Sequence, residues 1–167
     1  MKFRRLLLFI ILASLVVVAT ACHASNTSGG YTAYQKKSFR AEISGTLSDI
    51  PFGAVIEKTD AEAQLAYLRP DALAGITLCR NGEGLFLKLG EKKTPVSDDT
   101  LAGLLSPLDI LASENEVLRI QKADDGYILS LPADGALTLS SKCLPTNYAS
   151  PALRFTVAWW ENLSSGS

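Results

Sequence analysis

Histidine is almost absent from this sequence. Among the 167 residues only His23 is a histidine, and it lies outside the region that carries the regular apolar patterns. Zinc sites with histidine ligands, Ser-His-Asp triads and Cys-His pairs all need an imidazole inside the folded region. The sequence therefore excludes most hydrolase mechanisms and predicts a protein that is not an enzyme and needs no metal or cofactor.

A basic cluster is also absent. The chain has 16 Lys and Arg against 17 Asp and Glu, and loss of residues 1–21 would leave 13 against 17, a net charge of about −4. Nucleic-acid-binding domains need a basic surface that matches the phosphate backbone. We therefore expect no nucleic-acid partner, and the sequence identifies no protein partner.

The first 21 residues have the layout of a signal peptide. A short basic start, Met1 to Arg5, precedes an apolar run from Leu6 to Ala21. As a helix this run would rise roughly 24 Å at about 1.5 Å per residue, less than the roughly 30 Å of a bilayer core. The pattern favours a secretory signal peptide over a permanent membrane span.

The residues that end the apolar run, Val18-Ala19-Thr20-Ala21-Cys22, resemble the lipobox of bacterial lipoproteins. In that family the cysteine sulfur receives a diacylglyceryl group, and the cysteine becomes the new N-terminus. The resemblance implies an extracytoplasmic protein anchored to the bacterial cell membrane, since two acyl chains hold a protein stably. The alternative is ordinary cleavage after Ala21 or Ala24, which would leave a secreted soluble protein.

The rest of the chain indicates one domain. Residues 22–37 are rich in Ser, Thr, Gly and Asn without a sustained apolar period, so we expect a lipid-anchored flexible tether there. Residues 38–160 form the predicted domain, and residues 161–167 a C-terminal tail. Cys79 and Cys143 lie inside the domain, where a disulfide and two separate thiols both remain open, because a bridge needs Cα atoms within about 7 Å.

Alternating apolar and polar residues predict short strands from residue 39 onward. Phe39, Ala41, Ile43 and Leu47 share one face of the first strand, and Ser48-Asp49 reverses the chain into a second. Hairpin turns are predicted at Asn81-Gly82, Asp125-Gly126 and Asp134-Gly135, where Asn or Asp before Gly suits positive φ.

One segment has helical spacing instead. Leucines 101, 105, 108 and 111 follow a Ser-Asp-Asp start that suits a helix N-terminus, over residues 97–112. Pro107 predicts a kink near Ser106 or two short helices. The expected fold class is mainly β (α+β), a curved antiparallel sheet or unclosed β-barrel of about eight or nine strands with this short helical insertion on its concave face.

Paired carboxylates occur at 98 and 99, 114 and 116, and 124 and 125, and we interpret them as capping and turn residues rather than as a catalytic or calcium site. Near the C-terminus, the parity of Phe155 and Val157 predicts that Trp159 faces inward and Trp160 outward or to the rim. These indoles either complete the core and shield the edge or contact a ligand or membrane.

An anchored lipoprotein whose sheet opens on FRAEISGTLSDIPFGAVIEKT, with a leucine-rich helix in mid-chain and an aromatic last strand, is similar to the LolA/LolB-like fold. Members of that group are unclosed barrels whose concave face holds acyl chains under helices. The resemblance implies a lipid or other hydrophobic ligand between sheet and helix; the alternative is an interaction or structural lipoprotein with a filled core. The candidate ligand-binding residues are Phe39, Ile43, Phe52, Ile56, Leu101, Leu105, Leu108, Phe155 and Trp159.

Overall fold

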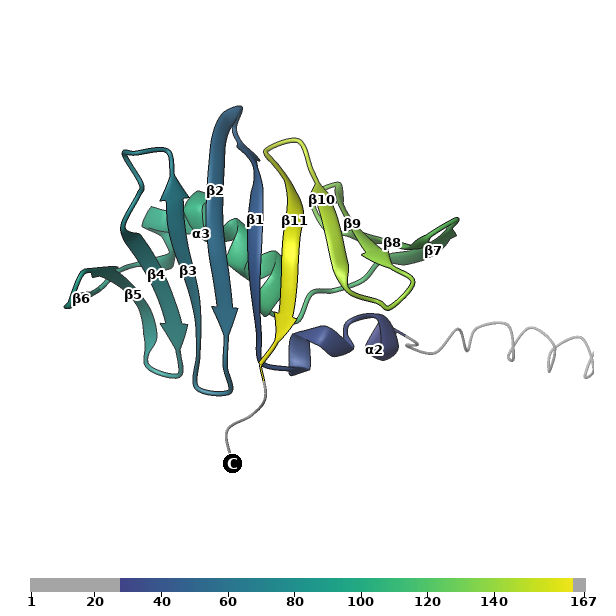
Figure 1. Ribbon diagram of the computed structural model, residues 1–167, viewed down its shortest axis with the longest axis horizontal. Helices are drawn as coiled ribbons and strands as arrows, with labels where there is room; N and C mark the ends of the chain where they lie inside the picture. Colours follow the sequence, from purple (N-terminus) through teal and green to yellow (C-terminus); the bar gives the residue numbers. More distant parts are fainter. Residues whose placement is uncertain (1–27, 164–167) are drawn as a thin grey trace, which may run out of the picture.

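A computed structural model describes residues 28–163 (Figure 1). Its main feature is one antiparallel sheet of eleven strands in the order β6-β5-β4-β3-β2-β1-β11-β10-β9-β8-β7. The strands are β1 Phe39–Leu47, β2 Ile50–Lys58, β3 Glu62–Arg69, β4 Ile76–Asn81, β5 Gly84–Leu89, β6 Lys92–Pro95, β7 Arg119–Ala123, β8 Gly126–Leu131, β9 Gly135–Ser140, β10 Pro145–Ala149 and β11 Leu153–Asn162.

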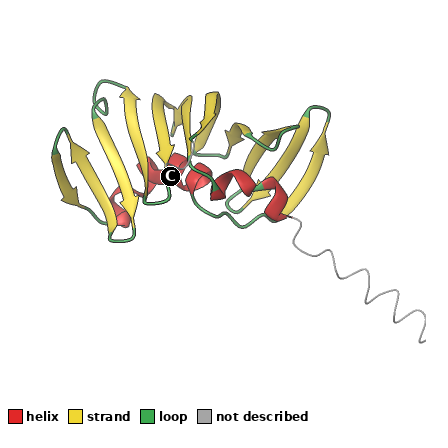
Figure 2. Cartoon of the chain, turned by 60° about the horizontal axis from the view of Figure 1, so that its bottom comes forward, coloured by secondary structure: helices red, strands yellow, loops and turns green. Residues whose placement is uncertain are grey.

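The chain builds this sheet from the middle outward and then from the far edge back. Strands β1 to β6 follow one another to one edge, and helix α3, Asp98–Ala112, then carries the chain across to β7 at the other edge. Strands β7 to β11 return to the middle, where β11 pairs with β1. The sheet is not closed, and α3 lies against one face of it (Figure 2). The predicted fold class is confirmed.

Two strands lie beyond the eight or nine that the alternation predicted. β6 has the sequence KKTP and is exposed at all four residues, and β10 has the sequence PTNYA. Neither has an apolar alternation; β6 is an edge strand that pairs on one side only, with β5. Lysines and proline on such an edge discourage pairing with other chains.

The predicted hairpins form, but their turns are displaced by one residue. β8 pairs with β9 around Ala133 and Asp134, both with φ near 55°, and Gly135 already begins the next strand. Gly126 begins β8 and does not have positive φ; a Cβ there would lie 1.9 Å from the Leu139 carbonyl oxygen. Glycine is therefore required at 126 by close strand contact and not by turn geometry.

The turn predicted at Asn81-Gly82 centres on Gly82 and Glu83, and Gly84, with φ 131°, begins β5. The side-chain oxygen of Asn81 accepts a hydrogen bond from the Glu83 backbone N–H. The reversal predicted at Ser48-Asp49 is confirmed in place, with φ of 48° and 66° between paired Leu47 and Ile50.

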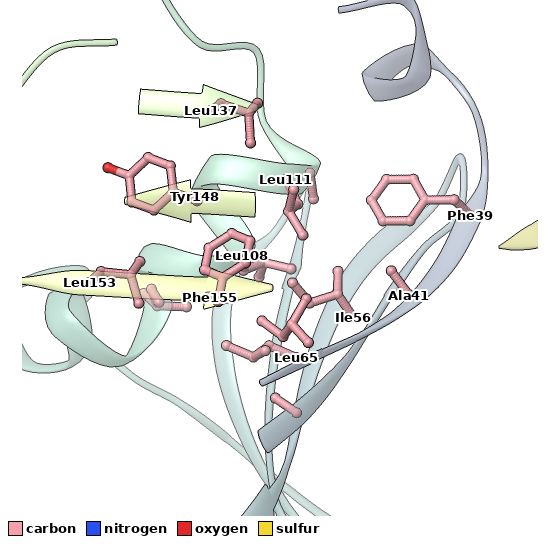
Figure 3. Packing of buried hydrophobic residues seen from close by; sticks show 14 of the residues in the cluster. Phe39, Ala41, Ile56, Leu65, Leu108, Leu111, Leu137, Tyr148, Leu153 and Phe155 are labelled. Carbon is pink, nitrogen blue, oxygen red and sulfur yellow. The ribbon is translucent and has the colours of Figure 1, made fainter. Parts of the chain in front are cut away.

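Helix α3 is continuous, so Pro107 does not divide this segment into two short helices, one of the two forms predicted for it. Proline removes one hydrogen bond, the one that its N–H would donate to the Gly103 carbonyl. The loss is tolerated because Leu105, Leu108 and Leu111 are almost completely buried against the sheet and fix the helix from one side. Figure 3 shows Leu108 and Leu111 among side chains from several strands, including Ile56, Leu65 and Phe155.

The N-terminal segment corrects the prediction of a flexible tether over residues 22–37. Helix α2, Ser28–Tyr31, and the 3₁₀ helix η1, Ala33–Lys36, pack on the domain. Tyr34 is 3% exposed and makes an edge contact with Trp160, with ring centroids 5.5 Å apart. The tyrosines supply apolar area that a composition rich in Ser and Gly concealed. Residues 22–27 of the predicted tether, the predicted signal peptide and Cys22 lie outside the described residues.

The two tryptophans exchange the faces predicted for them. The pairing of β1 with β11 shifts between Glu42 and Ile43, so that Glu42 lies opposite Trp159 but Ile43 lies opposite Val157. This bulge reverses the inward and outward alternation beyond it. Trp160 therefore stacks on Phe39, with centroids 4.1 Å apart, and Trp159 lies on the outer face.

The cysteines do not form the disulfide that the sequence left open. Cys79 is on β4 and Cys143 is in the turn before β10, and both thiols are free. Strands β4 and β10 are five strand spacings apart, about 24 Å along the sheet, whereas a bridge needs Cα atoms within about 7 Å. The predicted tail at 161–167 is also shorter, because β11 continues through Asn162.

Candidate functional site

An apolar cavity of about 310 Å³ opens where the hairpin tips of the sheet meet the first half of α3. We call it the tip cavity. The β1–β2 turn, β2, β3, the turn after β3 and α3 all contribute to its wall. The wall consists of Leu47, Ser48, Ile50, Phe52, Tyr67, Pro70, Leu73, Leu101, Gly103 and Leu104.

The Tyr67 hydroxyl in the wall of the tip cavity is satisfied within the protein. The Tyr67 hydroxyl donates a hydrogen bond of 2.7 Å to the Leu104 carbonyl and so joins β3 to α3. Burial raises the pKa of Tyr67 to about 12, which keeps the phenol neutral. A neutral, already paired hydroxyl leaves the cavity with the character of a site for apolar groups.

Apolar side chains also surround the mouth of the tip cavity. Ile50 follows the β1–β2 turn and is 58% exposed, although it shares the inward parity of Phe52. Leu73 and Leu101 also line the cavity and are half-buried. Apolar area at the mouth is expected where an apolar ligand enters and leaves.

A second cavity, of about 550 Å³, adjoins the first and is more polar. We call it the mixed cavity. Leu47, Ser48 and Gly103 belong to the walls of both cavities. The remaining wall consists of Ser106, Asp109, Ile110, Pro132, Ala133, Tyr148, Ser150, Pro151, Ala152 and Leu153.

Polar contacts hold the C-terminal end of α3 against the rest of the domain. The Lys58 ammonium donates hydrogen bonds to the carbonyls of Gln35 and Ala112, the latter at 2.8 Å, and so joins η1, β2 and the helix C-terminus. The Asn115 amide donates to the Ile110 carbonyl at 2.7 Å. Burial lowers the pKa of Lys58, while nearby Glu114 and Asp60 oppose that shift. Neither the tip cavity nor the mixed cavity reaches Lys58 or Asn115.

The structure divides the nine predicted ligand-binding residues. Phe52 and Leu101 line the tip cavity. Trp159 is on the outer face, where its indole N–H donates to Glu42. The others line neither cavity and are at most 3% exposed in the packed interior: Phe39, Ile43, Ile56, Leu105, Leu108 and Phe155.

Several wall residues were not among the predicted ones. Leu47 and Ile50 have the inward parity that identified Phe52, so the alternation contained their signal. Leu73 lies in an irregular turn, and Gly103 has no side chain, so no periodic pattern indicates either. Within residues 28–163, no group of three His, Cys, Asp or Glu is placed to hold a metal ion.

Comparison with known proteins finds no matching family model and no matching curated protein. An uncharacterized conserved protein from Thermus thermophilus is similar in structure, with 11% identity, a TM-score of 0.49, and coverage of 78% of this chain and 81% of that one. A LolA superfamily protein from Nitrosomonas europaea has 16% identity and a TM-score of 0.36, with 71% and 67% covered. At these values neither similarity assigns a family or a function.

Among the described residues, no helix has both the length and the apolar character needed to cross a membrane.

Proposed function

We propose that the protein is an extracytoplasmic lipoprotein, anchored to the bacterial cell membrane through Cys22, that binds a hydrophobic ligand in the tip cavity. The observation that supports binding is the apolar wall between the hairpin tips and the first half of α3. Its volume of about 310 Å³ falls at the lower end of small-molecule sites, which span roughly 300–1,000 Å³. One acyl chain is a ligand of suitable shape and chemistry.

The proposed ligand site is smaller than the one the sequence predicted. Leu105, Leu108 and Leu111 fill the space between sheet and helix, so an acyl chain would enter only at the hairpin tips. This filled interior also favours the second candidate function, an interaction or structural lipoprotein of the cell envelope without a ligand. The two candidates differ in whether the tip cavity is occupied.

Native mass spectrometry of the full-length protein, extracted in detergent from bacterial membranes, distinguishes them. We expect a co-purifying lipid on the wild type and its loss from Leu104→Trp, because the indole would occupy the cavity. Leu118→Trp is the matched control, since Leu118 is 60% exposed and lines neither cavity. The absence of lipid from the wild type would favour the second candidate, and equal lipid occupancy in both variants would show that the lipid binds outside the tip cavity and overturn the proposed site.

The anchor is tested separately. In cells fed an alkyne analogue of palmitate, the wild type should acquire the label and Cys22→Ser should not, because the apolar run ends in small residues directly before Cys22. Equal labelling of the two proteins would contradict the anchor and leave the tip cavity unaffected.

A further inference from the structure

We infer that the tip cavity and the mixed cavity form one groove for a single-chain amphiphile whose head is uncharged and donates hydrogen bonds. This rests on the binding function proposed above and adds the chemistry of the ligand's polar end. The chain would occupy the tip cavity, and the head would lie in the mixed cavity beyond Gly103.

Gly103 connects the two cavities. It belongs to both walls, and a Cβ built on it would meet no atom within 4 Å. Glycine inside a helix is less favourable than alanine, so nothing in local stability selects it here. Its missing side chain leaves space open at the boundary between an apolar wall and a more polar one.

The wall of the mixed cavity supplies acceptors. Pro107 has no N–H, so the Gly103 carbonyl lacks the donor that position 107 supplies in an ordinary helix. The Ser106 hydroxyl gives its proton to the Ala102 carbonyl at 3.0 Å, and the Ser150 hydroxyl gives its proton to the Leu153 carbonyl. The Ser106 hydroxyl can then only accept from a ligand, and the Ser150 hydroxyl, which already accepts from the Leu153 N–H at 3.1 Å, keeps one further lone pair for a ligand. A ligand head that donates hydrogen bonds complements this wall.

Charge disfavours an anionic head. Asp109 is the one charged residue that the described chain contributes to this wall, and its side chain is 40% exposed. Arg80 of β4 donates to the Asp109 carboxylate but does not itself belong to the wall. The charge within the wall itself is therefore negative, and although Arg80 partly offsets it, it opposes a phosphate or carboxylate.

A matched pair of ligands tests the inference. 1-Monopalmitoylglycerol and 1-palmitoylglycerol 3-phosphate share a chain and a glycerol and differ only in the phosphate. Full-length protein in detergent, delipidated and then given both ligands at equal concentration, should retain the uncharged ligand in about tenfold excess by native mass spectrometry, a difference near 1.4 kcal/mol.

Three variants test which residues produce the ligand preference and the binding itself. Asp109→Asn should reduce the preference, whereas Arg80→Gln should increase it, because the carboxylate then loses its counter-charge. Gly103→Leu should reduce binding of both ligands by filling the boundary, with unchanged circular dichroism confirming the fold. Leu118→Trp should keep the wild-type preference.

The outcomes separate the two proposals. Binding of both ligands without preference, or a preference that Asp109→Asn leaves unchanged, would overturn the inference about the head and leave the hydrophobic site standing. Binding of neither ligand would overturn the proposed function itself. Unimpaired binding by a folded Gly103→Leu would overturn the single groove, because the two cavities would then act separately.

Discussion

The two halves of α3 rest on the same sheet and are packed differently. In the second half, Leu105, Leu108 and Leu111 are at most 1% exposed, and Lys58 fixes the helix C-terminus to β2 and η1. In the first half, Leu101 and Leu104 are half-buried, Gly103 is exposed, and the tip cavity adjoins the helix, whereas the mixed cavity extends from Gly103 along Ser106, Asp109 and Ile110. The tip cavity therefore borders only the first half of the helix, whereas the second half has buried leucines on one side and borders the mixed cavity on another.

The difference shows where a meander sheet leaves room for a ligand. Inward side chains recur every second residue along a strand and fill the space beneath a helix. At a turn such as Ser48-Asp49 the strand alternation stops, so no regular row of inward side chains fills the space beside the turn. Cavities therefore lie at the hairpin tips without any loss of packing in the interior.

The largest expected effect is the difference in unfolding free energy between shortening a leucine in the second half of α3 and shortening one in the first half. Leu108→Ala removes buried atoms from a full interior and should lower the free energy of unfolding by about 2–5 kcal/mol. Leu104→Ala, one helical turn earlier, enlarges a space that already exists and should cost well below that range. Urea midpoints with matched m-values measure both. Equal losses would mean that the first half is packed as tightly as the second.

Removing the Lys58 ammonium, which binds the C-terminal end of α3, should cause an intermediate loss of stability. Lys58→Met keeps an apolar stem but leaves the carbonyls of Gln35 and Ala112 without their donor, at a cost of about 1–3 kcal/mol. Lys122→Met, at an exposed position of β7, is the control. Amide exchange near Tyr34 should accelerate in Lys58→Met alone. Unchanged exchange there would contradict the role given to Lys58.

The smallest effect concerns the hydroxyl in the tip cavity. The pKa of Tyr67 is about 12 in the folded protein and near 10 in the unfolded chain, so the folded state retains a proton that the unfolded state releases between these values. Stability should therefore fall as pH rises from 10 to 12.

Tyr67→Phe removes this contribution. It should cost about 1 kcal/mol at neutral pH through the lost hydrogen bond to Leu104, and the alkaline loss should be less steep than in the wild type. Tyr34, whose pKa burial also raises, and Lys58, whose lowered pKa acts in the opposite direction, are common to both proteins. Parallel stability curves against pH would show that the Tyr67 pKa is not raised.

The alternation in the sequence predicts the sheet because every second residue of a half-buried strand must be apolar. Nine strands, their hairpins and the span of α3 followed from this rule and from the leucines of residues 97–112. β6 and β10 did not, since an exposed edge and a short polar strand carry no such pattern. The bulge opposite Glu42 reversed the tryptophans because one inserted residue shifts the parity of all that follow.

The candidate site was only partly predictable. Parity indicates which residues face inward, and Phe52 and Leu101 do line the tip cavity. Parity does not show whether an inward residue is packed or borders a void, and Ile43 and Leu108, which were predicted to contact a ligand, are buried and line neither the tip cavity nor the mixed cavity. That distinction depends on where the helix crosses the strands. The crossing is a property of the assembled fold, and no single segment encodes it.

The positions of the chain ends have a consequence for orientation. β1 begins beside the end of β11, where the Leu163 N–H donates to the Ser38 carbonyl at 3.0 Å, so both ends of the domain emerge at one edge. The Ser48-Asp49 turn lies at the opposite end of β1, about 27 Å away for eight residue steps. With a lipid on Cys22, the domain would attach by its lower edge in Figure 1 and direct the mouth of the groove away from its own bilayer. Under the proposed binding function, the ligand would then arrive from the aqueous side or from a facing membrane rather than from the leaflet that holds the proposed anchor.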